Sequence, residues 1–273
     1  MEKAHSDQNI RIVIQAIIFT FIGMILISNI INLLSRSGVT IFRNSAISNI
    51  LLELTILAVQ LMILRRYYKR AIIKELGLTI KEMSWSRITL FFAVGTGIVA
   101  LSFVILMAVS IVHYEGTGFR LIGSKETFQL LFSRLVQMLV VAIAEETCFR
   151  GVIANHLDKR SGKTVAILGS TMIFTVFHCM VWQTVTQITD IFVLGLILGI
   201  LFMRSGSLYD AIIFHFAIDF VTNLFGMEAG EGVIILSLGN GYREADITMY
   251  LFGVMTVLGV VACIALSLIR DRK

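Results

Sequence analysis

The chain has 273 residues, of which 57% are hydrophobic and 15% charged, and its formal net charge is +5. Soluble globular domains carry about 25% charged residues, so this composition, with a mean hydropathy of +0.87, excludes an ordinary soluble protein. The positive charge does not require a nucleic-acid partner, because membrane proteins concentrate basic residues in cytoplasmic loops beside anionic lipid. The sequence predicts a membrane protein without a sizeable soluble domain.

Eight windows of about 20 residues with few or no charges are long enough to cross roughly 30 Å of hydrocarbon as helices. In chain order they cover residues 12–34, 46–64, 88–112, 127–155, 164–182, 188–203, 208–225 and 247–269. Helices are expected because backbone groups in lipid must be satisfied within the segment, and the alternating pattern of a membrane barrel does not occur. The predicted fold class is an all-α polytopic helix bundle, with residues 1–273 as one membrane domain.

The distribution of Lys and Arg predicts the orientation, because cytoplasmic loops carry an excess of basic residues. The segment between the second and third windows, residues 65–87, contains Arg65, Arg66, Lys69, Arg70, Lys74, Lys81 and Arg87. If this segment is cytoplasmic, alternation of the spans places both termini and most other basic residues on the same side. We therefore expect a multi-pass protein of a cell membrane, embedded in the lipid bilayer, with both termini cytoplasmic. Its first part, RRYYKRAIIKEL at residues 65–76, could be an amphipathic interfacial helix or an ordinary solvated loop.

The fourth window ends in AEETCFRG, where two adjacent carboxylates and an arginine interrupt an apolar run. Ionisable groups within membrane spans are costly and usually mark a functional site. Glu146 and Arg150 are four residues apart, so they share a helix face and can form a charge-assisted pair. Glu145 points about 100° away from that face. The spacing predicts a structural Glu146–Arg150 pair and leaves Glu145 as an acid without a local partner.

The fifth and seventh windows each contain a histidine at helical spacing from another candidate residue. Phe174 and His178 are four residues apart, as are His215 and Asp219. Together with Glu145, two imidazoles can hold and deprotonate a water molecule, or bind a metal that does so. Asp219 could orient His215 or stabilise developing charge. The alternative is that these residues simply pair to hold helices together, and spacing alone leaves both interpretations open.

Three further acids, Glu53, Asp190 and Asp210, fall within or at the edge of the windows. Tyr209 and Asp210 form the dipeptide used by intramembrane aspartyl proteases, but the G-x-G-D partner motif does not occur, so Asp210 is interpreted as a loop-edge residue. The sequence also lacks H-E-x-x-H, G-x-S-x-G and a Walker loop.

Three motifs together resemble those of the CPBP family, the CAAX proteases and bacteriocin-processing enzymes, also called abortive-infection-like proteins. EETCFRG is similar to EExxxR, FTVFH to FxxxH, and GLILGILFMRSGSLYDAIIFHFAID to the glycine-rich stretch that ends in HxxxN/D. The resemblance covers about residues 126–225, less than half of the chain. Each motif is weak by itself, but three in this order, each within a predicted span, are specific.

The resemblance implies an intramembrane endopeptidase that acts on a peptide or membrane-protein substrate, with its helices around a cytoplasm-facing cavity. Glu145 would be the general base that activates water. Glu146 and Arg150 would organise this base. His178 and His215 would position the water or, with Glu145, bind a divalent metal such as zinc. The family is labelled as metalloproteases, and a metal-free glutamate mechanism has also been proposed, so the cofactor stays open.

Asp219 would occupy the oxyanion-stabilising position of the family, where prenyl-protein endopeptidases have asparagine. An ionised Asp can only accept hydrogen bonds, so this departure leaves open whether prenylated substrates are used. The small size and plain N-terminus are more similar to bacterial members, associated with peptide maturation and bacteriocin immunity, and indicate a bacterial plasma membrane.

Two other functions are compatible with the residues. One is a non-catalytic bacteriocin-immunity or peptide-binding membrane protein. The other is a transporter whose buried Glu and His relay protons. The absence of proline and of two similar halves counts against the transporter.

Overall fold

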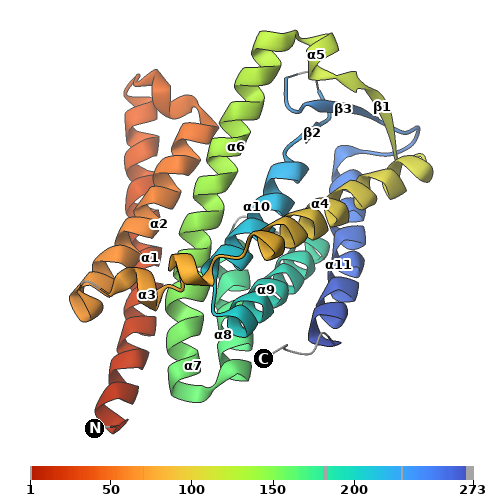
Figure 1. Cartoon of the computed structure of the whole chain (residues 1–273). Coiled ribbons are helices and arrows are strands. Elements are labelled where there is room, and N and C mark those ends of the chain that lie inside the picture. Colours follow the sequence, from red (N-terminus) through yellow and green to blue (C-terminus); the bar gives the residue numbers. More distant parts are fainter. Residues whose placement is uncertain (1, 70, 181–183, 229, 269–273) are drawn as a thin grey trace.

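A computed structural model describes residues 2–69, 71–180, 184–228 and 230–268 of the chain, and most of the described backbone is helical (Figure 1). Four basic residues used for the predicted orientation, Arg70, Arg270, Arg272 and Lys273, lie outside the described residues.

The N-terminal part of the chain consists of α1 (Glu2–Arg36), η1 (Thr40–Arg43), α2 (Ser45–Tyr68), α3 (Ile72–Glu75), η2 (Ile80–Glu82), α4 (Trp85–Ala108), β1 (Val112–Thr117) and α5 (Gly118–Leu121). The C-terminal part consists of α6 (Ser124–Glu146), η3 (Thr147–Ala154), α7 (Asn155–Ser161), α8 (Lys163–His178), α9 (Val185–Ser205), α10 (Leu208–Thr222), β2 (Phe225–Gly226), β3 (Ile234–Leu238) and α11 (Glu244–Leu268).

Six helical segments of the described chain are long and apolar enough to cross a membrane: Ser6–Arg36, Ser45–Tyr68, Trp85–Ala108, Ser124–Ser161, Val185–Ser205 and Glu244–Ala265. A polytopic helical protein is therefore confirmed, but the predicted count of eight spans is not. The fifth and seventh predicted spans correspond to α8, with 16 residues, and α10, with 15. Both are shorter than the roughly 20 residues that a full crossing needs.

The segment that carries the two glutamates is one continuous helical run from α6 through η3 to α7. η3 is a π-helical stretch that begins at Thr147, directly after the glutamates, and all its residues are buried. π-Helical turns within α-helices often occur at functional sites, because the extra residue changes which side chains share a face. The EExxxR motif thus lies at the junction between α-helical and π-helical geometry.

The helices pack so that those carrying the motifs lie inside the bundle. α2 packs between α1 and α6, and α10 packs against α4, α6 and α9. α9 also contacts α8 and α11. At the α4–α10 crossing, a Cβ added to Gly95 would lie 2.9 Å from the Cβ of Ala217. Small residues permit such close helix contacts in membranes.

A small sheet of order β1-β3-β2 caps one end of the bundle, next to the start of α6 (Figure 1). β1 is antiparallel to β3, and β2 is parallel to β3. None of these strands was predicted from the sequence, because they are short and because β1 and β3 lie more than a hundred residues apart in the chain.

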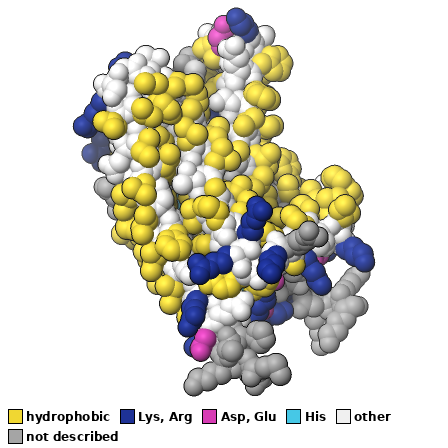
Figure 2. Space-filling view, turned by 90° about the vertical axis from the view of Figure 1, so that its left-hand side faces the viewer, with side chains coloured by type: hydrophobic (Ala, Val, Ile, Leu, Met, Phe, Trp, Pro, Cys, Tyr) yellow, Lys and Arg dark blue, Asp and Glu magenta, His cyan; other side chains and the backbone are white. Residues whose placement is uncertain are grey.

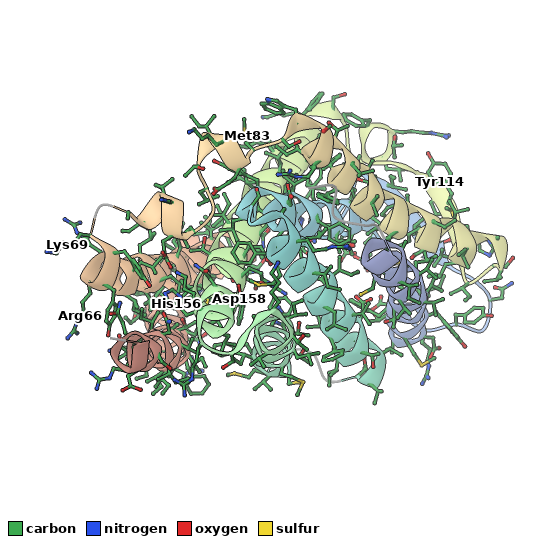
Figure 3. All side chains as sticks on the ribbon, turned by 60° about the horizontal axis from the view of Figure 1, so that its bottom comes forward. Arg66, Lys69, Met83, Tyr114, His156 and Asp158 are labelled. Atoms are coloured by element: carbon green, nitrogen blue, oxygen red, sulfur yellow. The ribbon has the colours of Figure 1, made fainter. Side chains whose placement is uncertain are left out.

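The basic segment 65–87 lies at the other end of the bundle and is tied to α7. Lys159 pairs with Glu75, and Asn155 donates to the Glu75 carbonyl at 2.8 Å. His156 contacts the Tyr68 hydroxyl at 2.9 Å. Figure 3 shows Arg66 and Lys69 on the same side of the molecule as His156, away from Tyr114 of β1. Figure 2 shows that Lys and Arg gather along the lower part of that view, below a broad hydrophobic surface. Of residues 65–76, for which an amphipathic helix was one of two alternatives, residues 65–68 form the end of α2 and residues 72–75 form α3.

Candidate active site

The predicted pair of Glu146 and Arg150 is present, and it lies fully buried beneath the rest of the site. Both side chains are fully buried, and Arg150 Nη1 donates to Glu146 Oε1 at 2.8 Å. Arg150 Nη2 donates to the Gly195 carbonyl of α9 at 3.1 Å, and the guanidinium lies 4.5 Å from the centre of the Phe174 ring. The carbonyl and the aromatic face compensate part of the cost of burying the charge. Arg150 therefore links η3 to α8 and α9.

Glu146 has a second partner that the helical spacing did not indicate. His215 Nδ1 of α10 lies 2.8 Å from Glu146 Oε1. Because the carboxylate oxygen also accepts from Arg150, the histidine donates from Nδ1. This hydrogen bond fixes the ring so that Nε2 is the nitrogen directed away from Glu146.

Glu145 lies between the two predicted histidines. Its Oε1 is 3.6 Å from His178 Nε2, and its Oε2 is 3.7 Å from His215 Nε2. His178 Nδ1 lies 2.9 Å from the Phe174 carbonyl, which can only accept, so Nε2 is the acceptor of the neutral ring. Both separations from Glu145 exceed a direct hydrogen bond and are of the size that a water molecule bridges. The FxxxH spacing thus serves to orient the histidine through the Phe174 backbone.

Asp219, the last predicted residue, lies one turn beyond His215 on the same face. Its Oδ2 is 3.3 Å from His215 Nε2. His215 consequently has Glu146 at one ring nitrogen and Glu145 with Asp219 at the other. All six predicted residues, Glu145, Glu146, Arg150, His178, His215 and Asp219, are brought together.

A cavity of about 440 Å³ lies next to this cluster. Its lining includes Glu145, His178, His215 and Asp219. It is also lined by Ser45 and Asn49 at the start of α2, Arg134 on α6, and Thr222 and Asn223 at the end of α10. Ser45 and Asn49 are exposed, so the cavity reaches the surface at the end of the bundle where α2 begins.

The direction of this opening conflicts with one of the sequence-based expectations. The basic segment 65–87 follows the other end of α2. A cavity that faces the cytoplasm and a cytoplasmic 65–87 segment therefore cannot both occur, because they lie at opposite ends of the same helix. The motifs do not indicate on which side a site opens, because that depends on how α2, α6 and α10 are packed.

Two acids without a predicted role also line the cavity, Glu53 of α2 and Asp190 of α9. They are 6% and 7% exposed, and Asp190 Oδ1 lies 3.3 Å from the Thr256 hydroxyl of α11. Their presence within apolar windows was the only available sequence signal. Asp210, interpreted as a loop-edge residue, lies in the first turn of α10; its side chain is fully buried, and Arg87 Nε donates to it at 2.9 Å.

Within the described part of the chain, no group of three or more His, Cys, Asp or Glu side chains is placed to hold a metal ion. Glu145, His178 and His215 remain the candidate set from the sequence.

The fold and the cluster define a polytopic helical membrane protein with an intramembrane site made of one carboxylate between two histidines. Residues 127–221 match the family model described as type II CAAX prenyl endopeptidase Rce1-like. This match confirms, over residues 127–221, the resemblance predicted from the three motifs. It supports a protease that acts on peptide or protein substrates within a membrane. No curated protein matches the chain.

Proposed function

We propose that this protein is an intramembrane endopeptidase in which Glu145 activates water to hydrolyse a peptide bond of a membrane-associated peptide or protein. The observation that carries the proposal is the position of Glu145 between two imidazole nitrogens, at 3.6 and 3.7 Å, within a cavity. Its Oε2 atom is buried and has no hydrogen-bond partner among the described residues. A carboxylate placed in this way is suited to act as a general base on a bound water.

In the proposed reaction, Glu145 takes a proton from the water while His178 Nε2 accepts a hydrogen bond from the second hydrogen. The water oxygen attacks the carbonyl carbon, and negative charge develops on the carbonyl oxygen. His215 stabilises this charge from Nε2, because the carboxylates of Glu146 and Asp219 stabilise a positive charge on its ring. Asp219 acts here through His215, which suits an acceptor-only side chain better than direct donation to the substrate.

Glu146 and Arg150 act as positioning residues in this proposal. The hydrogen bond from His215 Nδ1 to Glu146 keeps Nε2 directed at the cavity, in the way that carboxylates orient catalytic histidines elsewhere. Arg150 in turn holds Glu146.

We further propose that the whole chain works as one membrane domain in a cell membrane. Met24 of α1, Glu53 of α2 and Phe252 of α11 line the cavity although they lie outside the matched residues 127–221. With the 65–87 segment and both termini in the cytoplasm, the cavity opens on the opposite side of the membrane. The substrate then enters from the extracytoplasmic side. No observation favours the non-catalytic immunity or peptide-binding alternative. In that alternative, the position of Glu145 between two histidines would have no explanation.

The test is cleavage by the purified protein in detergent, offered a pool of cellular membrane peptides whose products are identified by mass spectrometry. We expect Glu145→Gln to lower the rate by at least about 100-fold, the low end of a general base's contribution. The matched control is Glu126→Gln, the same change at an exposed position on the same helix. Equal cleavage by both variants, or no cleavage by the unaltered protein, would contradict the proposal.

A further inference from the structure

Glu53 is a cavity carboxylate that the three motifs do not include. It lies on the buried face of α2, which also presents Ile56, Gln60 and Ile63 at helical spacing toward the bundle. α2 packs against α6, the helix of Glu145. The cavity brings Glu53 together with Glu145 and His215 although α2 lies outside the matched residues 127–221.

The surroundings of Glu53 favour its neutral form. The side chain is 6% exposed, and its Oε2 atom is buried without a hydrogen-bond partner among the described residues. None of the ion pairs in the described chain includes it. Glu145, His215 and Asp219 line the same cavity, and two of these three groups are acidic. Glu145 also has a buried Oε2 without a hydrogen bond, but two histidine nitrogens lie 3.6 and 3.7 Å from its carboxylate, whereas Glu53 has no such neighbour among the ion pairs of the described residues. Because a buried carboxylate without donors is costly and neighbouring acids resist a further negative charge, Glu53 is the one of the two that is held as a carboxylic acid able to give up a proton.

Hydrolysis of a peptide bond needs such a donor. The amine is a poor leaving group unless its nitrogen is protonated as the carbon–nitrogen bond breaks, and a positioned acid commonly supplies that proton. Glu145 is the base in the first half of the reaction. Two carboxyl groups held in opposite protonation states divide acid and base roles in this way in other hydrolases.

We propose that Glu53 is a further catalytic residue, the general acid that protonates the leaving amine, and this rests on the proposed function. Glu145 removes a proton from water as the water oxygen bonds to the carbonyl carbon. The tetrahedral intermediate then breaks its carbon–nitrogen bond while the Glu53 carboxyl gives its proton to the nitrogen. The products are a carboxylic acid and an amine. The proton on Glu145 returns to Glu53 through cavity water, which restores both groups.

The experiment compares two versions of a peptide that the protein cleaves, one with the natural amide at the scissile bond and one with a thioester. A thiolate leaves without being protonated, because thiols have a pKa of about 8.5, so only the amide needs the acid. We expect Glu53→Gln to lower amide cleavage by at least about 100-fold while thioester cleavage stays within a few-fold of the unaltered protein. Glu145→Gln should lower both, and Glu126→Gln neither.

Failure of the Glu53 inference and failure of the proposed function give different results. Similar losses on amide and thioester for Glu53→Gln would mean that Glu53 supports the structure or the base, and retained amide cleavage would mean that it has no role; either overturns the inference. Retained cleavage by Glu145→Gln would overturn the proposed function instead. Thermal unfolding in detergent provides the folding control, because Gln keeps the shape of a neutral Glu and should leave the unfolding temperature unchanged. A large drop for Glu53→Gln would itself argue for a structural role.

Discussion

At the scale of single residues, the two adjacent glutamates differ because the helix directs them to different partners. Glu146 accepts from Arg150 and His215, both at 2.8 Å, and is fully buried. Glu145 faces the cavity without a direct hydrogen bond to either histidine. The Glu146 carboxylate accepts two hydrogen bonds and so contributes to the structure. The Glu145 carboxylate has no such donors and is free to take a proton.

The two glutamates should consequently fail in different ways when each is changed to Gln. Glu146→Gln leaves Arg150 without its carboxylate, and breaking a buried pair costs about 3–5 kcal/mol of the free energy of unfolding. Glu145→Gln removes a buried charge, so stability should stay equal or rise slightly. Thermal unfolding curves in detergent measure both effects.

Two further variants control this comparison. Glu146→Gln combined with Arg150→Met removes both charges, so we expect it to regain stability over Glu146→Gln alone. Asp246→Asn removes the charge that pairs with Arg243 at the surface, while the Asn side-chain oxygen can still accept from the Arg243 backbone N–H, so stability should change little. A greater loss of stability in Glu145→Gln than in Glu146→Gln would reverse the assigned roles.

At the scale of helices, the site depends on how closely α4 and α10 approach, because α10 carries both His215 and Asp219. Gly95 lies at this crossing, and an added Cβ would meet the Ala217 Cβ at 2.9 Å and the Phe214 carbonyl oxygen at 3.1 Å. Neither atom is at the end of a flexible side chain. The position of α10 relative to Glu146 of α6 is therefore sensitive to the size of residue 95.

We expect Gly95→Ala to lower the free energy of unfolding by about 1–3 kcal/mol, the usual cost of overpacking, and to reduce cleavage by displacing His215. Gly97 on the same helix is the matched control, because a Cβ there meets nothing within 4 Å. Gly97→Ala should be neutral or stabilising, since Ala is the better helix former. The measurements are unfolding in detergent and cleavage rate. If both variants behave alike, the α4–α10 contact does not limit the site.

At the scale of the whole molecule, the cavity opens at one end of the bundle and the basic segment lies at the other. At 1.5 Å per residue, Glu53 is about 12 Å from the Ser45 end of α2 and about 22 Å from the Tyr68 end. The cluster is thus nearer to the end with Ser45 and Asn49. Leu76, which follows the other end of α2, is buried and lies close to Gly151 of η3.

We expect a cysteine at the cavity mouth and one in the basic segment to react from opposite sides of the membrane. In a chain with Cys148, Cys179 and Cys263 replaced by Ser, Asn49→Cys should react with a membrane-impermeant maleimide in intact cells. Lys81→Cys, also exposed, should react only in inside-out vesicles. Labelling of both from the same side would contradict the opposite placement. A reversal of the two would keep the placement and overturn the predicted orientation.

Features that depend on neighbours along one helix could be predicted from the sequence. Hydrophobic windows identified a helical membrane protein, and the four-residue spacing predicted the Glu146–Arg150 pair. The three motifs also predicted the six residues that lie together at the site. Three contacts could not be predicted in this way: the hydrogen bond from His215 to Glu146, the place of Glu53 in the cavity, and the pairing of β1 with β3. These contacts join segments distant in the chain, and helical periodicity reports which face of a helix is buried without reporting which helix lies against it. The lengths of α8 and α10, and the end at which the cavity opens, depend on the same long-range packing.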